Sequence, residues 1–532
     1  MRPGYSSQPS QSSQPSQPPR PRRLNLRPSQ RLRLPLRSHE DLKSFDARGT
    51  FKIPSVEHTS PAGRGADAAS HGGGSSLPTN RADLVVIGNG IAGCIAAMET
   101  RQHAPDARIL IISEQNHPTI NTPALKQFGA GRLELDQLLA YSAGTQQHLG
   151  IGMIHRRVAA IEPSGHRVRL SDGRAIQYRS LLIATGATAT PLPDEMPGRD
   201  FDGVVTLHTL SDYLDLRRRL ATVSSAVVIG GGYHAAETAM LLRHQRVKVT
   251  WLIRGRGLLP RQLDPAASDL LLRQVRRQSV DIRLEAEVSG IVGRMGVTAG
   301  VITTDNAFIP CELVVAAIGT QPDITLAQHT HIEAKPGRGM RVNGRLQTTA
   351  RDIYAAGAVA AVLDPQTGQY DARGQWYFAV QQGRLAAAAI TGVASSEDVA
   401  QDAVGNFWHA TQFEKLNVLT AGAPMLSERD NPENEVLTNG SGAFYRRLVV
   451  RHGHLVGFLA VGSNQPPGLG IKRLIDERIN IEEIKRKLLS EDFDVRSFFT
   501  QRRLHALETG EAAAIPQPVM DQTIMPIAAW PG

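Results

Sequence analysis

Residues 82–102 read ADLVVIGNGIAGCIAAMETRQ, and this stretch decides the fold of the chain. Residues 84–87 form a short, nearly continuous apolar run, which predicts a parallel strand buried on both faces. Gly88, Gly90 and Gly93 follow it as a GxGxxG motif at the start of an alanine-rich helix. In such a unit the glycines permit a tight turn, the approach of a pyrophosphate and close packing of helix on strand. The stretch therefore predicts a dinucleotide-binding site.

The next apolar run strengthens this prediction. Residues 107–115, ARILIISEQ, predict a second strand that ends at Glu114. A carboxylate at this position can accept hydrogen bonds from the ribose diol of a bound dinucleotide. An ordinary glycine-rich turn between a strand and a helix is the alternative, and it does not account for the second strand and its terminal acid.

A second unit of the same kind occupies residues 226–253, AVVIGGGYHAAETAMLLRHQRVKVTWLI, with Gly230, Gly232 and Ala235 in the motif positions. Two such units predict an α/β fold with two Rossmann-like dinucleotide-binding domains. They also predict two bound dinucleotides. One is normally a flavin and the other a nicotinamide, because a bound flavin can take hydride from a diffusible carrier.

Composition limits the remaining possibilities. A length of 532 residues suggests two to four domains. Cys94 and Cys311, the two cysteines, form no CxxC or Cys/His cluster, so we expect no metal site and no local redox-active dithiol. No apolar run approaches the roughly 20 residues of a membrane-spanning helix. We expect a soluble, cytoplasmic protein.

The basic charge is concentrated near the N-terminus. Residues 1–80 hold 12 Lys+Arg and five Asp+Glu, and the remaining residues have a net charge of only +2. This leader, rich in Pro, Ser and Gln, is expected to be disordered. It could be a solvated arm or misassigned start, a weak polyanion or membrane-surface binder, or a transit segment. Nucleic-acid binding has no support outside the leader.

Four further segments carry a family resemblance. LLIATGATATPLP (181–193) and LVVAAIGTQPD (313–323) resemble segments that connect a flavin domain with a nicotinamide domain. DIYAAGAVA (352–360) resembles a second flavin motif, and RGQWYFAVQQGRLAAAAITG (373–392) resembles the helix that covers the isoalloxazine. Residues 82 to about 395 therefore resemble the pyridine nucleotide-disulfide oxidoreductase family. The closest branch lacks the active disulfide and comprises FAD/NAD(P)H reductases of the rubredoxin, ferredoxin and nitrite reductase type.

The resemblance also implies a domain organisation. The stretch from YRRLVVRHGHLVGFLAVG to IKRLIDERINIEEIKRKLL resembles the small C-terminal α+β domain of those reductases, which often lies at a dimer interface. A homodimer is therefore possible. The implied parts are a disordered leader at 1–80, a discontinuous FAD domain at 81–200 and 335–395, an NAD(P)H domain at 201–334, the small domain at 396–500 and a tail at 501–532.

By this resemblance the chain is an FAD-dependent NAD(P)H oxidoreductase that passes electrons to an external acceptor such as a ferredoxin or rubredoxin. The segment after Glu114, QNHPTINTPALKQF, contains no cysteine, so no thiol relay is expected. Two alternatives stay open. One is a flavin-poor scaffold or redox sensor, and the other is a membrane-associated NADH:quinone-type oxidoreductase.

The resemblance assigns roles to individual residues. Glu237 is expected to contact the nicotinamide carboxamide, and Trp376 to lie near the flavin; these two are the candidate catalytic residues. Ala358 replaces an Asp that bonds the ribityl chain in the family. Thr122 stands where the family usually has an arginine, with Lys126 as the candidate substitute cation. The candidate cofactor-binding residues are Gly88, Gly90, Gly93, Glu114, Lys126, Thr185, Gly186, Gly230, Gly232, Ala235, Arg254, Arg256, Gly319, Gly357 and Ala358.

The choice of nicotinamide depends on the end of the second unit. No acid follows Ile253, and Arg254 and Arg256 suit a 2'-phosphate, which favours NADPH over NADH. Two solvated loop arginines are the alternative. His234 and His409 have no metal-ligand spacing and are interpreted as ordinary surface or packing histidines.

Overall fold

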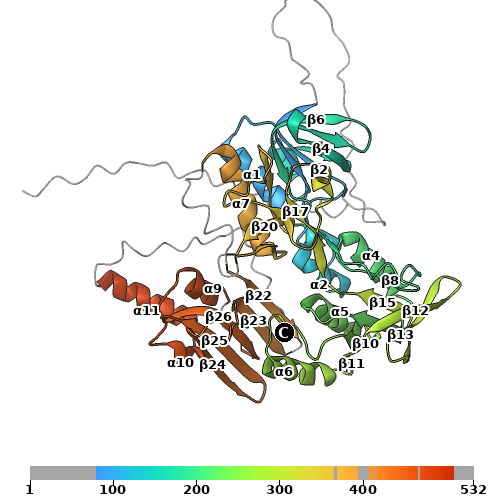
Figure 1. Cartoon of the computed structure of the whole chain (residues 1–532), viewed down its shortest axis with the longest axis vertical. Helices are drawn as coiled ribbons and strands as arrows, with labels where there is room; N and C mark the ends of the chain where they lie inside the picture. Colours follow the sequence, from blue (N-terminus) through green and yellow to red (C-terminus); the bar gives the residue numbers. More distant parts are fainter. Residues whose placement is uncertain (1–79, 365–367, 394–405, 414, 465–467, 509–532) are drawn as a thin grey trace, which may run out of the picture.

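The structure of the chain is a computed structural model that describes residues 80–364, 368–393, 406–413, 415–464 and 468–508. The predictions for the leader concern residues outside this part, as do those for the tail beyond residue 508. Figure 1 shows three sheet-containing units, which we call the first unit, the second unit and the C-terminal unit. The first unit lies at the top, the second at the lower right and the C-terminal unit at the lower left.

The first unit contains a seven-stranded sheet in the order β3-β2-β1-β6-β5-β4, with β19 also paired to β6. Strands β1, β2, β3, β6 and β19 run parallel, whereas β4 and β5 are antiparallel additions. The strands are β1 (Arg81–Ile87), β2 (Ile109–Ser113), β3 (Gly152–His155), β4 (Val158–Glu162), β5 (Arg167–Leu170), β6 (Ala175–Ile183) and β19 (Ile353–Ala355).

Two long helices lie side by side in this unit, α1 (Ile91–His103) and α7 (Trp376–Thr391) (Figure 1). They approach closely because Gly383 has no side chain; a Cβ there would lie 2.6 Å from the carbonyl oxygen of Ala92. The segment 373–392 thus returns from far along the chain to pack on the first helix. Two shorter helices lie between β2 and β3 in the chain: α3 (Thr145–His148) and α2 (Leu125–Gly129), whose Leu125 and Phe128 pack in the core cluster of the second unit.

The second unit contains a parallel five-stranded sheet in the order β11-β10-β9-β15-β8. Its strands are β8 (Val204–Val205), β9 (Ser225–Ile229), β10 (Lys248–Ile253), β11 (Asp281–Leu284) and β15 (Leu313–Ala316). Its helices are α4 (Leu210–Arg219), α5 (Tyr233–His244) and α6 (Pro265–Arg276). An antiparallel sheet of β12 (Val288–Arg294), β13 (Val297–Thr303) and β14 (Phe308–Pro310) lies beside it.

Smaller sheets lie where the chain passes between units. Strands β7 (Ala187–Ala189) and β16 (Thr320–Pro322) pair antiparallel. A four-stranded sheet joins β17 (Ala334–Lys335), β18 (Gly339–Arg341), β20 (Ala360–Leu363) and β21 (Tyr370–Ala372).

The C-terminal unit is an antiparallel five-stranded sheet in the order β22-β23-β26-β25-β24. Its strands are β22 (Trp408–Phe413), β23 (Leu416–Gly422), β24 (Asn434–Ser441), β25 (Phe444–Arg451) and β26 (His454–Gly462). Its helices are α9 (Gly468–Asp476), α10 (Lys485–Leu488) and α11 (Val495–Glu508).

The two faces of this sheet have different partners. Residues of one face, such as Phe458, form a buried cluster with Ile471 and Leu474 of α9. Phe413 and Leu459 belong instead to the core cluster of the second unit, together with Leu241 of α5. The C-terminal sheet therefore packs directly on α5, the helix that begins after the second glycine motif.

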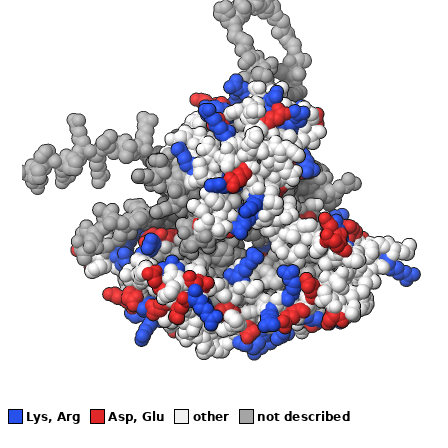
Figure 2. Space-filling model, in the orientation of Figure 1, with Lys and Arg blue, Asp and Glu red and all other residues white. Residues whose placement is uncertain are grey.

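The described residues contain no candidate membrane span, and the face seen in Figure 2 carries both signs of charge. No helix among them is long and apolar enough to cross a bilayer. Figure 2 shows Lys and Arg interspersed with Asp and Glu over the visible face. This distribution agrees with the small net charge that the sequence assigns to the chain after the leader.

Candidate dinucleotide sites and the cluster between them

The first glycine motif forms an open cradle at the start of α1. Gly88 has a φ of +109°, and a Cβ there would collide with the carbonyl oxygen of Ala184, so this turn requires glycine. Around Gly90, in contrast, no heavy atom lies within 4 Å of the Cβ position. No side chain caps the start of α1, which leaves its first N–H groups for another acceptor. The residues present therefore fit a pyrophosphate.

The second motif repeats this geometry at the start of α5. Gly230 has a φ of +136° and its Cβ position is filled by the carbonyl oxygen of Ala317. Gly232 again faces open space, and α5 has no side-chain cap. Ala235, in the place of the third glycine, is fully buried. This cradle also fits the phosphates of a dinucleotide.

Other groups expected around the first cradle are only partly present. Glu114 follows β2 directly and is exposed. The N–H of Gly357 donates to Oε1 of Gln382 at 2.7 Å, and the next residue, Ala358, offers no acceptor. Trp376 begins α7 and packs against a small cluster that includes Ile91. The phosphate and ribose positions thus fit FAD, while the ribityl position lacks the family carboxylate.

The two connecting segments singled out in the sequence lie against each other. Ala187–Ala189 pairs with Thr320–Pro322, so the residues that follow Gly186 and Gly319 share one small sheet. The hydroxyl of Thr185 donates to the backbone oxygen of Asp323 at 3.0 Å. These bonds hold together the ends of the two parallel sheets from which the cradles project.

An ion pair connects the chain segment between β2 and β3 of the first unit with the second unit. Lys126 of α2, in that segment, pairs with Glu237 of α5. Thr411 of the C-terminal unit donates to the same carboxylate oxygen at 2.7 Å. Burial alone would raise the pKa of Glu237, but the charge of Lys126 and these hydrogen bonds outweigh burial and lower that pKa. One ionised carboxylate therefore contacts all three units.

Two histidines lie beside this pair, His234 and His409, which the sequence analysis interprets as ordinary surface or packing residues. The centre of the His409 ring, on β22, lies 4.0 Å from the centre of the Tyr233 ring. Burial lowers the pKa of His409 to about 4, and Glu237 offsets only part of that effect. Burial also lowers the pKa of His234, the second residue of α5. Both imidazoles are therefore neutral at neutral pH.

A sequence signal for His409 exists, but it needs the fold to be recognised. Side chains alternate across a strand, so His409, Thr411 and Phe413 share one face of β22. Phe413 belongs to the core cluster of the second unit, which identifies this face as the one turned toward α5.

The two arginines at the end of β10 are exposed and paired with acids. Arg256 lies 3.0 Å from Glu285, and Arg254 lies 3.8 Å from Glu287. A 2'-phosphate would compete with these carboxylates, and a 2'-hydroxyl could donate to them. The preference for NADPH stays a prediction.

Both cysteines are buried free thiols. Burial raises the pKa of each to about 11, so neither is a thiolate at neutral pH. The thiol of Cys94 lies within 3.6 Å of the Gln146 amide, inside the first unit. Neither position offers a nucleophile for a thiol relay.

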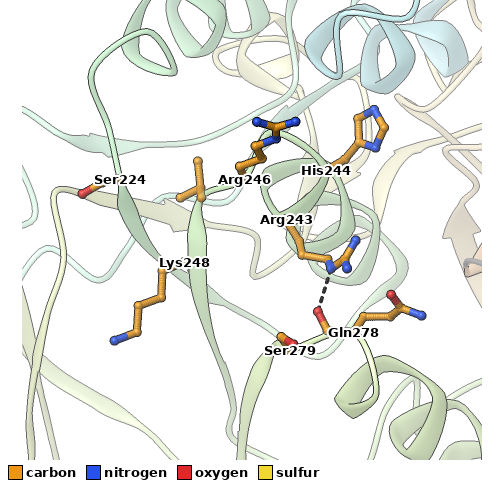
Figure 3. Close-up of a pocket in the computed structure, with 8 residues that line it drawn as sticks. Ser224, Arg243, His244, Arg246, Lys248, Gln278 and Ser279 are labelled. Atoms are coloured by element: carbon orange, nitrogen blue, oxygen red, sulfur yellow. Dashed lines mark hydrogen bonds between the residues drawn. The ribbon is translucent and has the colours of Figure 1, made fainter.

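A basic cavity of about 500 Å³ lies at the opposite, amino-terminal edge of the second sheet. Figure 3 shows Lys248 and Ser279 extending from different elements, and Arg243 bonded to the backbone of Gln278 at 2.6 Å. Arg243 and His244 occupy the last turn of α5, where cations complement the partial negative charge of a helix end. This interaction with the helix end explains much of the basic lining of the cavity, so the lining is not evidence of a bound ligand.

Two open phosphate cradles at the starts of α1 and α5 define the class of protein as a two-dinucleotide oxidoreductase. The family model described as pyridine nucleotide-disulphide oxidoreductase matches residues 82–383, more than half of the chain. The chain belongs to this family. The predicted family, α/β fold class and oxidoreductase assignment are confirmed.

Individual relatives agree with this assignment. The ferredoxin–NAD(+) reductase component of a biphenyl dioxygenase system from Paraburkholderia xenovorans is 30% identical over 54% of this chain and 69% of its own. A rubredoxin–NAD(+) reductase from Ectopseudomonas oleovorans is 27% identical over 59% of this chain and 80% of its own. The covalent putidaredoxin reductase–putidaredoxin complex has the same fold, with a TM-score of 0.69 and 23% identity over 80% of this chain and 99% of that chain.

Proposed function

We propose that this protein is an FAD-dependent NAD(P)H oxidoreductase that passes electrons to a small external redox protein. The observation that carries the proposal is the pair of uncapped glycine cradles at the starts of α1 and α5, and the Lys126–Glu237 ion pair links α5 to α2, a helix of the segment between β2 and β3. The named reductases of ferredoxin and rubredoxin support this choice of acceptor class. The buried thiols support direct transfer from the flavin, since no disulfide stands between flavin and acceptor.

The first cradle is proposed to hold FAD and the second to hold the nicotinamide dinucleotide. When bound, FAD would supply the ring system that accepts hydride. The chain contributes positioning: N–H groups at the starts of α1 and α5 hold pyrophosphates, and Glu237 and Lys126 fix the distance between the units. The C-terminal unit covers the first turns of α5 through Tyr233 and Glu237 and so limits the access of water to this region.

Anaerobic titration of the purified protein with NADH and with NADPH tests this function. The expected result is loss of the flavin's visible absorption in proportion to added nicotinamide, followed by reoxidation when a ferredoxin or rubredoxin is added. A protein that neither retains nor takes up FAD would instead be the flavin-poor scaffold. We also propose a cytoplasmic location, which agrees with two unpaired thiols and is tested by cell fractionation. Recovery in the membrane fraction would favour the quinone-type alternative.

A further inference from the structure

The nicotinamide end of the second dinucleotide has only one region in which it can meet the flavin. Its pyrophosphate would lie at Gly232, and its reacting ring must extend toward the first unit, where FAD would lie. Glu237, one helical turn beyond Tyr233, bonds to Lys126 of that unit. The junction of α5, α2 and β22 therefore surrounds the expected position of the nicotinamide ring.

Two buried ring nitrogens in this junction lack a hydrogen-bond partner among the described residues. They are Nε2 of His409 and Nε2 of His234. Both side chains interact electrostatically with Glu237 and with Lys126. A buried polar atom without a partner is unfavourable and rare in native proteins. Both unpartnered nitrogen atoms lie beside the same ion pair, which indicates a binding site for a polar group of a ligand.

The free atoms differ in what they offer. His234 already uses its other ring nitrogen in a hydrogen bond with the backbone of Leu207. A neutral imidazole that donates from one nitrogen can only accept at the other, so Nε2 of His234 is an acceptor. Nε2 of His409 has no such restriction and can carry the proton. The junction thus combines an acceptor, a potential donor and the acceptor-only carboxylate of Glu237.

We propose that His234 and His409 recognise the carboxamide of the nicotinamide ring, with His234 accepting from its NH2 group and His409 donating to its carbonyl oxygen. A primary carboxamide has one carbonyl acceptor and two N–H donors, which matches this set of groups. The second N–H is available to Glu237. This inference rests on the proposed function, because it requires a nicotinamide dinucleotide in the second cradle.

Binding measurements on the full chain with three probes test the inference. NADH carries the complete carboxamide, its 3-acetylpyridine analogue keeps the carbonyl but lacks the NH2 group, and ADP-ribose lacks the ring. His234→Leu is expected to weaken NADH about tenfold and to leave the acetylpyridine analogue unchanged. His409→Phe, which retains a ring against Tyr233, is expected to weaken both ring-bearing probes about tenfold. Neither variant should change ADP-ribose binding.

The controls separate failure of this inference from failure of the proposed function. His244→Leu changes an exposed histidine of the same helix and should leave all three affinities unchanged. If the unmodified protein binds no ADP-ribose, the nicotinamide site itself is wrong. If His234→Leu or His409→Phe weakens all three probes equally, the histidines only support the fold and the inference is overturned. His409→Asn, which restores an N–H donor, should then fail to recover any NADH affinity, whereas carboxamide recognition predicts partial recovery.

Discussion

The two cradles have nearly the same backbone and very different surroundings. Gly88 and Gly230 both adopt positive φ against a backbone carbonyl, and Gly90 and Gly232 both face open space. Around the first cradle, the covering helix α7 belongs to the same unit. Over the second, β22 of the C-terminal unit covers α5 and contacts Tyr233.

This difference shows that the phosphates and the reacting end of a dinucleotide would be recognised by different kinds of structure. A phosphate cradle is determined by a few consecutive residues, because the turn and the helix start are local structures. The groups around the reacting end come from segments far apart in the sequence, as in the contact of Lys126 with Glu237. Equal cradles can therefore bind different dinucleotides. The following predictions test that comparison.

The largest expected effect comes from filling either cradle. Gly90→Val should reduce FAD affinity about 100-fold, because its side chain occupies the proposed position of the pyrophosphate. Gly232→Val should do the same for NADH while bound FAD is retained. Flavin content after gel filtration and calorimetry with NADH measure the two effects. Loss of FAD in Gly232→Val but not in Gly90→Val would reverse the assignment of the cradles.

Much of this comparison could be predicted from the sequence. Both motifs, both flanking strands and the connecting segments at Gly186 and Gly319 have local patterns, and the structure contains them as such. Lys126 and Glu237 were also singled out, but at separate cofactors. Their contact could not be predicted, since 111 positions separate them and no periodicity connects the two segments. His409 required knowledge of which face of β22 turns toward α5.

The second expected effect is a pH dependence of stability at the covered cradle. The folded-state pKa of His409 is about 4, below the ordinary value of 6.5, so the unfolded chain binds more protons between these values. Stability should therefore decrease as pH falls from about 6.5 to 4, by up to about 3 kcal/mol for this residue. Urea unfolding over this range should show a flatter profile for His409→Phe than for the unmodified protein. Parallel profiles would mean that His409 is accessible to protons in the folded state.

A third effect concerns the polar group missing from the first cradle. Ala358→Asp should tighten FAD binding by roughly 1 to 3 kcal/mol if residue 358 faces the ribityl chain, because it adds a charged acceptor. Glu114→Ala should weaken FAD, because the adenosine ribose loses its acceptor. Equilibrium dialysis of FAD against both variants measures the opposite shifts. An unchanged affinity in Glu114→Ala would remove the first motif from the flavin site.

The smallest effect is expected from replacement of the two cysteines. One cysteine lies in each of the two units that contain a cradle. Cys94 lies in α1 beyond Gly90, and Cys311 precedes β15 in the second unit. With pKa values of about 11, roughly one thiol in ten thousand is ionised at neutral pH, too few for a thiolate relay.

The double variant Cys94→Ala, Cys311→Ala should thus reduce a ferredoxin at the rate of the unmodified protein. It should lose only about 1 to 2 kcal/mol of stability, because both side chains are small and buried. Stopped-flow reduction of the flavin and then of the acceptor distinguishes the two half-reactions. Normal flavin reduction with loss of the second step would show that a thiol carries electrons outward, and the two cradles would then differ in chemistry as well as in what covers them.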